Sequence, residues 1–128
     1  MPVNNFSIIN KTKGELPSLP FVKMKEKILG KKYDLGLIFV SKNFIHSLNK
    51  KYRKVDSPTD ILSFPIDKKT GEIFICMEIA KKKSKDFERN INNFTAFLFI
   101  HGLVHLLGYD HGNKMEKIEN RYRSYFNI

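Results

Sequence analysis

The chain contains 128 residues, of which 41% are hydrophobic and 28% are charged. These values are typical of a globular protein and exclude a disordered or low-complexity chain. The length favours one domain spanning residues 1–128. Lys and Arg number 23 against 13 Asp and Glu, and the resulting net charge of +10 favours a polyanionic partner, above all nucleic acid.

Cys76 is the only cysteine, so no intrachain disulfide can form and nothing indicates an oxidising compartment. The first ten residues lack the basic and apolar regions of a signal peptide. The most apolar stretch, residues 94–109, is too short to cross a bilayer. We therefore expect a cytoplasmic protein with no membrane partner.

Short strands and helices alternate through the first half of the chain. We expect a strand at residues 6–9, a helix from Pro20 to about Leu29, and a strand at residues 35–40. Ser41 suits the N-cap of the next helix, whose apolar residues recur at three- and four-residue spacing over residues 44–52.

The middle of the chain has the pattern of an antiparallel hairpin. Strand-like residues 60–64 and 72–76 flank a turn at residues 67–71. Pro65 is tolerated only at the edge of a sheet or at the end of a strand.

Three helices are expected in the remainder, at residues 77–88, 92–107 and 114–126. Residues 92–107 are apolar almost all round, which is typical of a helix buried in the middle of a domain, and Gly108 ends it. The last helix is amphipathic, and we expect Ile118, Tyr122 and Tyr125 on its apolar face.

Three of the four histidines lie in one segment, His101-Gly-Leu-Val-His105-Leu-Leu-Gly108-Tyr-Asp-His111. Positions four apart in a helix lie about 40° apart around the axis and about 6 Å apart along it, so His101 and His105 point to a common site. Gly108 can take the left-handed conformation that ends a helix, so that the chain turns and His111 returns to that site. Two unpartnered histidines in an apolar helix would each cost about 1–3 kcal/mol, and a shared metal ion removes that cost.

Three neutral imidazoles suit one zinc-like divalent ion per chain, with water in the fourth position as in a catalytic site. Nickel and cobalt also accept this ligand set. Asp110 is the candidate to orient a ligand through a hydrogen bond. Cys76 is expected in the core, although as a fourth ligand it would make the metal purely structural. His46 has no second ligand three or four residues away and is expected on the surface.

The spacing H-x-x-x-H-x-x-G-x-x-H also matches a zinc-protease pattern. Those enzymes carry a glutamate directly after the first histidine as the general base. Gly102 occupies that position here and cannot accept a proton. Peptide hydrolysis is therefore the weaker alternative.

Two separate motifs resemble signatures of the bacterial endoribonuclease YbeY family of rRNA maturation factors. One is the histidine segment at residues 101–111, and the other is Asn49-Lys-Lys-Tyr-Arg-Lys-Val-Asp-Ser-Pro-Thr-Asp-Ile-Leu-Ser-Phe-Pro65. Over almost the whole chain, the resemblance implies an α+β fold in which a small mixed four-stranded sheet packs with about five helices. It places the metal site at the end of a buried helix. The chain departs from the family at Glu72 and Cys76, where an aspartate and usually a serine are expected.

The resemblance also implies a zinc ion held by His101, His105 and His111 and cleavage of single-stranded RNA. The implied roles are 3′-end processing of small-subunit rRNA and ribosome quality control. The small ribosomal subunit or its assembly factors are the implied partners, and DNA is not expected.

Arg53 matches the family's functional arginine, and its guanidinium suits contact with a phosphate across the cleft from the metal. Ser57 and Thr59 lie in the same motif and are candidate RNA contacts, although turn formation explains them equally well. The further candidates for contact with the RNA backbone are the lysines of the predicted helix at residues 77–88: Lys81, Lys82 and Lys83.

We therefore expect a metal-dependent endoribonuclease whose catalytic residues are Arg53, His101, His105 and His111. The sequence leaves open whether water or the neighbouring 2′-hydroxyl attacks phosphorus. The first alternative is an RNA- or ribosome-binding protein with a structural metal, which requires Cys76 or another side chain as a fourth ligand. A metalloprotease is the second.

Overall fold

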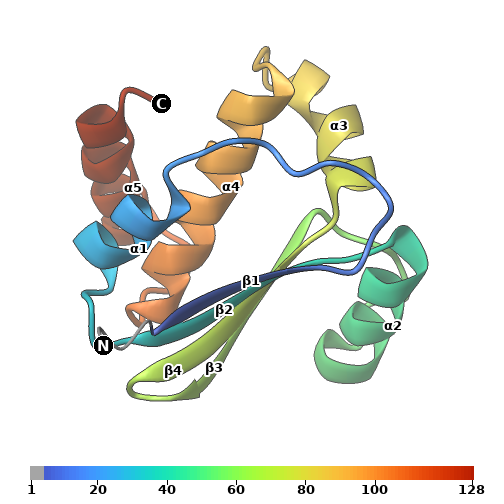
Figure 1. Ribbon diagram of the computed structural model, residues 1–128, viewed down its shortest axis with the longest axis horizontal. Coiled ribbons are helices and arrows are strands. Elements are labelled where there is room, and N and C mark those ends of the chain that lie inside the picture. The colour runs from blue at the N-terminus through green and yellow to red at the C-terminus, as the bar shows by residue number, and fades with distance from the viewer. Residues whose placement is uncertain (1–4) are drawn as a thin grey trace.

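The computed structural model describes residues 5–128 and contains, across that range, four strands and five helices. In chain order these are β1 (Phe6–Asn10), α1 (Phe21–Ile28), β2 (Asp34–Phe39), α2 (Lys42–Arg53), β3 (Ile61–Asp67), β4 (Thr70–Ile75), α3 (Met77–Asp86), α4 (Ile91–Leu106) and α5 (Asn113–Phe126). The strands form one mixed sheet in the order β1-β2-β4-β3, in which only β3 runs antiparallel to its neighbour. The predicted α+β fold is confirmed (Figure 1).

The two faces of the sheet carry different layers. Leu37 and Ile73 point to the face covered by α1, α4 and α5, where the main core forms. Ile38 and Leu62 point to the opposite face and pack against Ile45 of α2. This separation follows from the alternation of side chains along each strand. Figure 1 accordingly shows α4 and α2 on opposite sides of the sheet.

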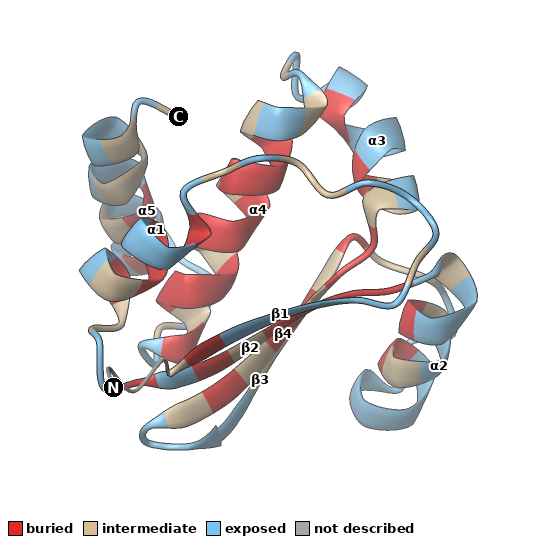
Figure 2. Ribbon diagram, viewed as in Figure 1, coloured by how far each residue is buried: buried red, intermediate tan, exposed pale blue. Residues whose placement is uncertain are grey.

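The main core is built around α4, in which ten of 16 residues are buried. Figure 2 shows this burial along most of the helix. Asn90 caps its first turn, because the side-chain oxygen accepts a hydrogen bond from the backbone N–H of Asn93 at 2.8 Å. The predicted central helix is therefore confirmed, and its packing fixes the position of every side chain at its C-terminal end.

The N-terminus of α2 is capped by Ser41, whose side chain accepts a hydrogen bond from the backbone N–H of Phe44 at 3.2 Å, as predicted. His46 lies at the surface of this helix, half-buried, and its Nε2 is 2.8 Å from Oδ1 of Asp56. The fourth histidine is thus part of a surface pair remote from the other three.

The hairpin is tighter than the sequence predicts. β3 continues through Pro65 to Asp67, and β4 begins at Thr70. The turn closes because the Asp67 side chain accepts a hydrogen bond from the backbone N–H of Lys69 at 2.8 Å. Pro65 is tolerated inside the strand because β3 is the edge of the sheet.

Two predictions about helices are wrong in detail. α3 ends at Asp86 instead of Glu88, which has a left-handed φ of 54°. On α5, Ile118 and Tyr122 pack against the core as predicted, but Tyr125 is 61% exposed. The residues of α5 that pack against the core recur every four positions, at Ile118, Tyr122 and Phe126. Tyr125 therefore lies beside this row of residues. Its ring contacts Lys27, whose Nζ is 4.3 Å from the ring centroid.

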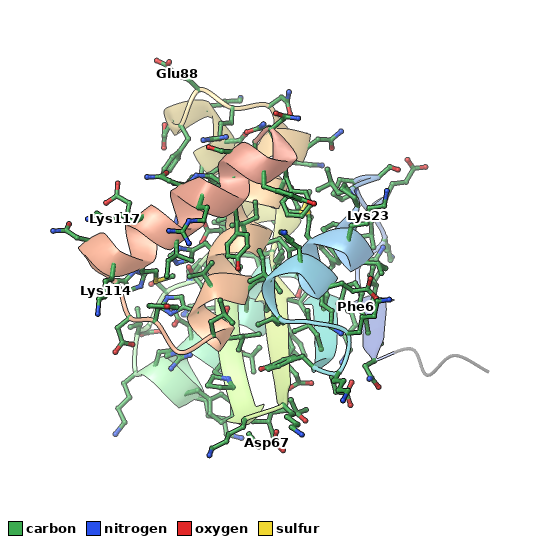
Figure 3. All side chains as sticks on the ribbon, turned by 90° about the vertical axis from the view of Figure 1, so that its left-hand side faces the viewer. Phe6, Lys23, Asp67, Glu88, Lys114 and Lys117 are labelled. Atoms are coloured by element: carbon green, nitrogen blue, oxygen red, sulfur yellow. The ribbon has the colours of Figure 1, made fainter. Side chains whose placement is uncertain are left out.

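The outer surface of the helical layer is charged. Figure 3 shows Lys114 and Lys117 of α5 pointing away from the body of the molecule. Over residues 5–128, no helix combines the length and the apolar character needed to cross a lipid bilayer.

Candidate metal centre

The three clustered histidines come from two neighbouring segments. His101 and His105 lie one turn apart on α4, and His111 lies in the turn between α4 and α5. Gly108 permits that turn because its φ of 107° is in the left-handed region that favours glycine. One ligand nitrogen from each histidine lies within 4.8 Å of the other two. The structure therefore brings the three predicted ligands together.

Hydrogen bonds fix which nitrogen two of these rings present. Nδ1 of His105 donates to the backbone carbonyl of Tyr109 at 3.0 Å, since a carbonyl can only accept. Nδ1 of His101 lies 2.7 Å from Oε1 of Glu119 and donates to that carboxylate. In the neutral form of each ring the proton is therefore on Nδ1, which leaves Nε2 as the nitrogen that can bind a metal ion.

The spacing of the donor atoms fits a small divalent cation. Nε2 of His105 lies 3.2 Å from Nε2 of His111. Two nitrogens bound tetrahedrally to zinc at about 2.0–2.1 Å are separated by about 3.3 Å. His105 and His111 therefore have the separation expected of two ligands of one small divalent ion, and the ligand nitrogens of all three histidines lie within 4.8 Å of one another.

The electrostatic surroundings also favour a neutral ligand at His105. Burial lowers the pKa of this imidazole, and the neighbouring His101 and His111 lower it further. A lowered pKa keeps the nitrogen lone pair available for a metal ion at neutral pH.

Gly102 is buried where α4 crosses the sheet. A Cβ atom at this position would lie 2.9 Å from Oγ of Ser63, 3.0 Å from Cδ1 of Ile61 and 3.1 Å from Cδ1 of Ile73. A larger side chain here would force these three side chains to move, so the position that holds the general base in the zinc-protease pattern is crowded in this fold.

A cleft of about 610 Å³ opens beside the three histidines. The ends of α2 and α4 and the edge strand β3 form its walls, and Arg53, Ser63 and Asp110 are among its lining residues. The Arg53 side chain donates from Nη2 to the backbone carbonyl of Ser63 at 2.6 Å. Its guanidinium also lies over the Phe64 ring, 4.9 Å from the centroid. Arg53 is thereby held at the cleft that the histidines share.

Several other predicted site residues lie outside this cleft. The backbone carbonyl of Ser57 accepts a hydrogen bond from the Asn49 side chain at 3.0 Å, and the Thr59 hydroxyl donates to Asp60 at 3.3 Å, so both stabilise the loop before β3. The exposed lysines of α3 are also outside the cleft: Lys81, Lys82 and Lys83. Within residues 5–128, Asp110 lines the cleft but forms no hydrogen bond with the three histidines.

Cys76 lies in the other core, on the α2 side of the sheet, where it packs with Ile38, Ile45 and Leu62. It is fully buried and does not belong to the histidine cluster. Glu72 is directed to the same side of the sheet, since its Cγ lies 3.7 Å from the Cβ position of Gly36. The two departures from the family pattern therefore lie across the sheet from the histidines.

The contacts that orient the ligands come from residues that the sequence analysis did not single out. Glu119 is buried and holds His101, and the Tyr109 carbonyl holds His105. The sequence contains a signal for Glu119, because it occupies a core-facing position of α5 four residues after the buried Met115. A carboxylate on an apolar stripe indicates a buried partner. The Tyr109 contact uses a backbone atom, and no side-chain pattern predicts it.

Comparison with known proteins agrees with this geometry. A family model described as endoribonuclease YbeY matches residues 11–125. The chain belongs to the endoribonuclease YbeY family. The endoribonuclease YbeY of Aliarcobacter butzleri is 39% identical over 108 residues, which is 80% of this chain and 76% of the relative. The protein of that name from Buchnera aphidicola is 38% identical over 118 residues, with coverage of 80% and 76%.

The fold is also similar to a solved structure. A protein from Thermotoga maritima, determined in solution, superposes with a TM-score of 0.65 at 29% sequence identity. The match covers 91% of this chain and 85% of that protein. YbeY family membership thus rests on the sequence matches, and the solved structure supports the α+β fold.

Proposed function

We propose that this chain is a cytoplasmic, zinc-dependent endoribonuclease that cuts single-stranded RNA, with residues 1–128 forming one catalytic domain. In this proposal it matures the 3′ end of small-subunit rRNA and acts in ribosome quality control, together with the small subunit or its assembly factors. The observation that carries the proposal is the convergence of three histidine nitrogens at a cleft that also holds Arg53. Membership of the endoribonuclease YbeY family and a net charge of +10 support an RNA substrate.

His101, His105 and His111 hold the metal ion in this proposal. A bound divalent cation supplies Lewis-acid activation of water or of a phosphoryl oxygen. Glu119 and the Tyr109 carbonyl keep two of the imidazoles in the tautomer that exposes Nε2.

Arg53 binds the scissile phosphate. Its planar guanidinium offers several N–H donors, of which one is engaged by the Ser63 carbonyl at 2.6 Å. The remaining donors can contact phosphate oxygens and stabilise the negative charge that grows on them in the transition state. The Phe64 ring beneath the guanidinium restricts its orientation, so little reorganisation is needed when RNA binds.

The structural-metal alternative is weaker because Cys76 lies across the sheet and His111 is exposed at an open cleft. A metal site with an open position is typical of catalysis. The metalloprotease alternative is weaker because Gly102 stands where the zinc-protease pattern has its general base and carries no group that accepts a proton.

The test compares cleavage of an end-labelled single-stranded RNA by the wild type, Arg53→Ala and Arg121→Ala. Arg121 is exposed on α5 and does not line the cleft. Its replacement removes one positive charge, as Arg53→Ala does, but at a position away from the candidate site. We expect Arg53→Ala to retain its metal and to cut about 10²–10³-fold more slowly, while Arg121→Ala stays close to the wild type. Equal rates for all three proteins would overturn the role of Arg53.

The ends of the products identify the attacking group. A 2′,3′-cyclic phosphate indicates attack by the neighbouring 2′-hydroxyl, whereas direct attack by water leaves a simple phosphate monoester. Absence of cleavage by metal-loaded wild type, combined with tight RNA binding, would favour the structural-metal alternative.

A further inference from the structure

A second cavity adjoins the histidine centre on the side away from Arg53. It has a volume of about 410 Å³ and is lined by residues of α3, α4 and α5 and of the loops beside them. His101 and His111 line both this cavity and the cleft that contains Arg53. A substrate chain that crosses the metal centre therefore meets the two cavities in succession.

The outer wall of the second cavity is aromatic. Phe87 is 51% exposed, and its ring centroid lies 5.1 Å from that of Phe94 and 5.6 Å from that of Phe97. Phe94 is fully buried, and the guanidinium groups of Arg89 and Arg123 both lie against the Phe97 ring, at 4.6 and 4.9 Å from its centroid. The Phe87 ring thus packs against Phe94 and Phe97, and its exposed part is apolar surface on which another ring can stack.

The polar lining of the second cavity is mixed, with three carboxylates beside the side chains of Arg123, His101 and His111. Asp60, Glu116 and Glu119 all line it. Asp60 is paired with Lys83, with Oδ2 3.6 Å from Nζ, and Glu119 is paired with His101 and Arg123. Glu116 is exposed and remains an acceptor for N–H donors on a ligand.

An aromatic wall beside a carboxylate acceptor is suited to a flat heterocycle that carries an N–H donor. Nucleobases stack on aromatic side chains in single-stranded RNA complexes and are read through their edges. The two arginines differ in their partners, because Arg123 of the second cavity is paired with Glu119, whereas the Arg53 guanidinium is bonded to the Ser63 backbone carbonyl and, among the described residues, to no carboxylate. The Arg53 cleft is therefore the one suited to phosphate. The two cavities therefore match the two alternating parts of an RNA chain.

We propose that the second cavity is a nucleobase subsite, in which the purine base of a nucleotide next to the scissile phosphate stacks on Phe87 and donates to Glu116. This inference rests on the proposed function, because it takes the histidine centre as the place of cleavage. Such a subsite would make cleavage depend on the base next to the scissile phosphate, a dependence that the Arg53 cleft alone does not provide. A purine is favoured over a pyrimidine because its larger ring system covers more of the aromatic wall.

The binding test uses free nucleosides, which lack phosphate. Adenosine, guanosine, cytidine and uridine are titrated into metal-loaded protein and followed by amide chemical shifts. We expect the two purines to shift amides around Phe87 and to bind more tightly than the pyrimidines. Phe87→Ala should weaken purine binding about tenfold, and Phe87→Trp should restore it, because stacking needs only an aromatic face. Tyr125→Ala, a loss of an exposed aromatic residue on the outer side of α5, should change nothing.

The cleavage test uses a short RNA with one purine beside the cut site and the same RNA with that base removed. We expect the wild type to cut the abasic RNA about tenfold more slowly, and Phe87→Ala to cut both RNAs at that lower rate. Normal cleavage of both RNAs by Phe87→Ala would overturn the subsite and leave the proposed nuclease function intact. Purine binding that depends on Phe87 without any RNA cleavage would uphold the subsite and overturn the proposed function.

Discussion

Oε1 of Glu119 lies 2.7 Å from Nδ1 of His101, joining the last helix to the metal centre. The carboxylate is nine-tenths buried, and Nη1 of Arg123 lies 3.6 Å from the same oxygen. Such a carboxylate fixes the imidazole tautomer and raises the basicity of the ligand nitrogen. α5 therefore supplies a contact that orients a candidate metal ligand, although none of its own residues belongs to the histidine cluster.

Replacing Glu119 should weaken metal binding. Glu119→Gln keeps an acceptor for Nδ1 but loses the charge, and Glu119→Ala loses both. We expect affinity for zinc to fall about 10–100-fold, with the larger loss in the alanine variant. Competition with a chromophoric chelator measures this, and Glu78→Gln, at an exposed acid on α3, is the control. Affinities equal to that of the wild type would show that the carboxylate does not support the ligand.

Adding one methyl group at Gly102 should destabilise the fold. Alanine is favoured over glycine by about 1 kcal/mol inside a helix. The new Cβ would nevertheless lie 2.9 Å from Oγ of Ser63, and such overpacking costs about 2 kcal/mol. We expect a net decrease in the free energy of unfolding of about 1 kcal/mol, measured with urea.

The control for that substitution is Gly36→Ala. Its new Cβ would lie 3.6 Å from the nearest atom, Cδ1 of Ile38, which is ordinary contact. This variant should be at least as stable as the wild type. A Gly102→Ala protein of equal stability would contradict the close approach of α4 to β3.

Replacing Cys76 should leave the metal content unchanged. The thiol is buried with Ile45 and Leu62 on the α2 side of the sheet, while the histidines lie on the α4 side. Cys76→Ala should cost about 1 kcal/mol of stability through lost packing. Metal analysis after dialysis should still give one ion per chain. Loss of the ion in this variant would restore the structural-metal alternative.

Acid should destabilise the metal-free protein through His105. Burial and the neighbouring histidines lower the pKa of this residue, so the unfolded chain takes up a proton at a higher pH than the folded chain. The contribution of His105 to stability is complete above its ordinary pKa of about 6.5 and is lost as the pH falls through the lowered pKa. Urea unfolding in the presence of a chelator at about pH 7.5 and about pH 5.5 measures this loss. His105→Gln should lose less stability over that interval, and an equal loss would contradict the assignment.

Local spacing is enough to predict the histidine cluster and the antiparallel hairpin, whereas the mixed four-stranded sheet is an expectation from the family resemblance. Residues four apart in a helix share a face, and a glycine can end that helix, so the meeting of His101, His105 and His111 follows from short-range geometry. Pro65 likewise predicts an edge strand, because proline cannot donate to a second neighbour.

The parts that the sequence did not predict depend on contacts between distant elements. Glu119 meets His101 only because α5 packs back along α4, and Arg53 reaches the Ser63 carbonyl only because α2 ends beside β3. Tyr125 belongs to the predicted apolar face of the last helix but is exposed, because helical periodicity does not identify which edge of that face is covered by the rest of the fold. The aromatic wall at Phe87 likewise forms only when the turn after α3 returns to α4.

The central claim is that the three histidines form a metal centre that cleaves RNA. The most direct test measures zinc content and cleavage of a labelled single-stranded RNA on the same preparations of wild type and His105→Ala. The account predicts about one zinc ion per wild-type chain with cleavage, and the loss of both in the variant. Equal cleavage by a variant that holds no metal would contradict it.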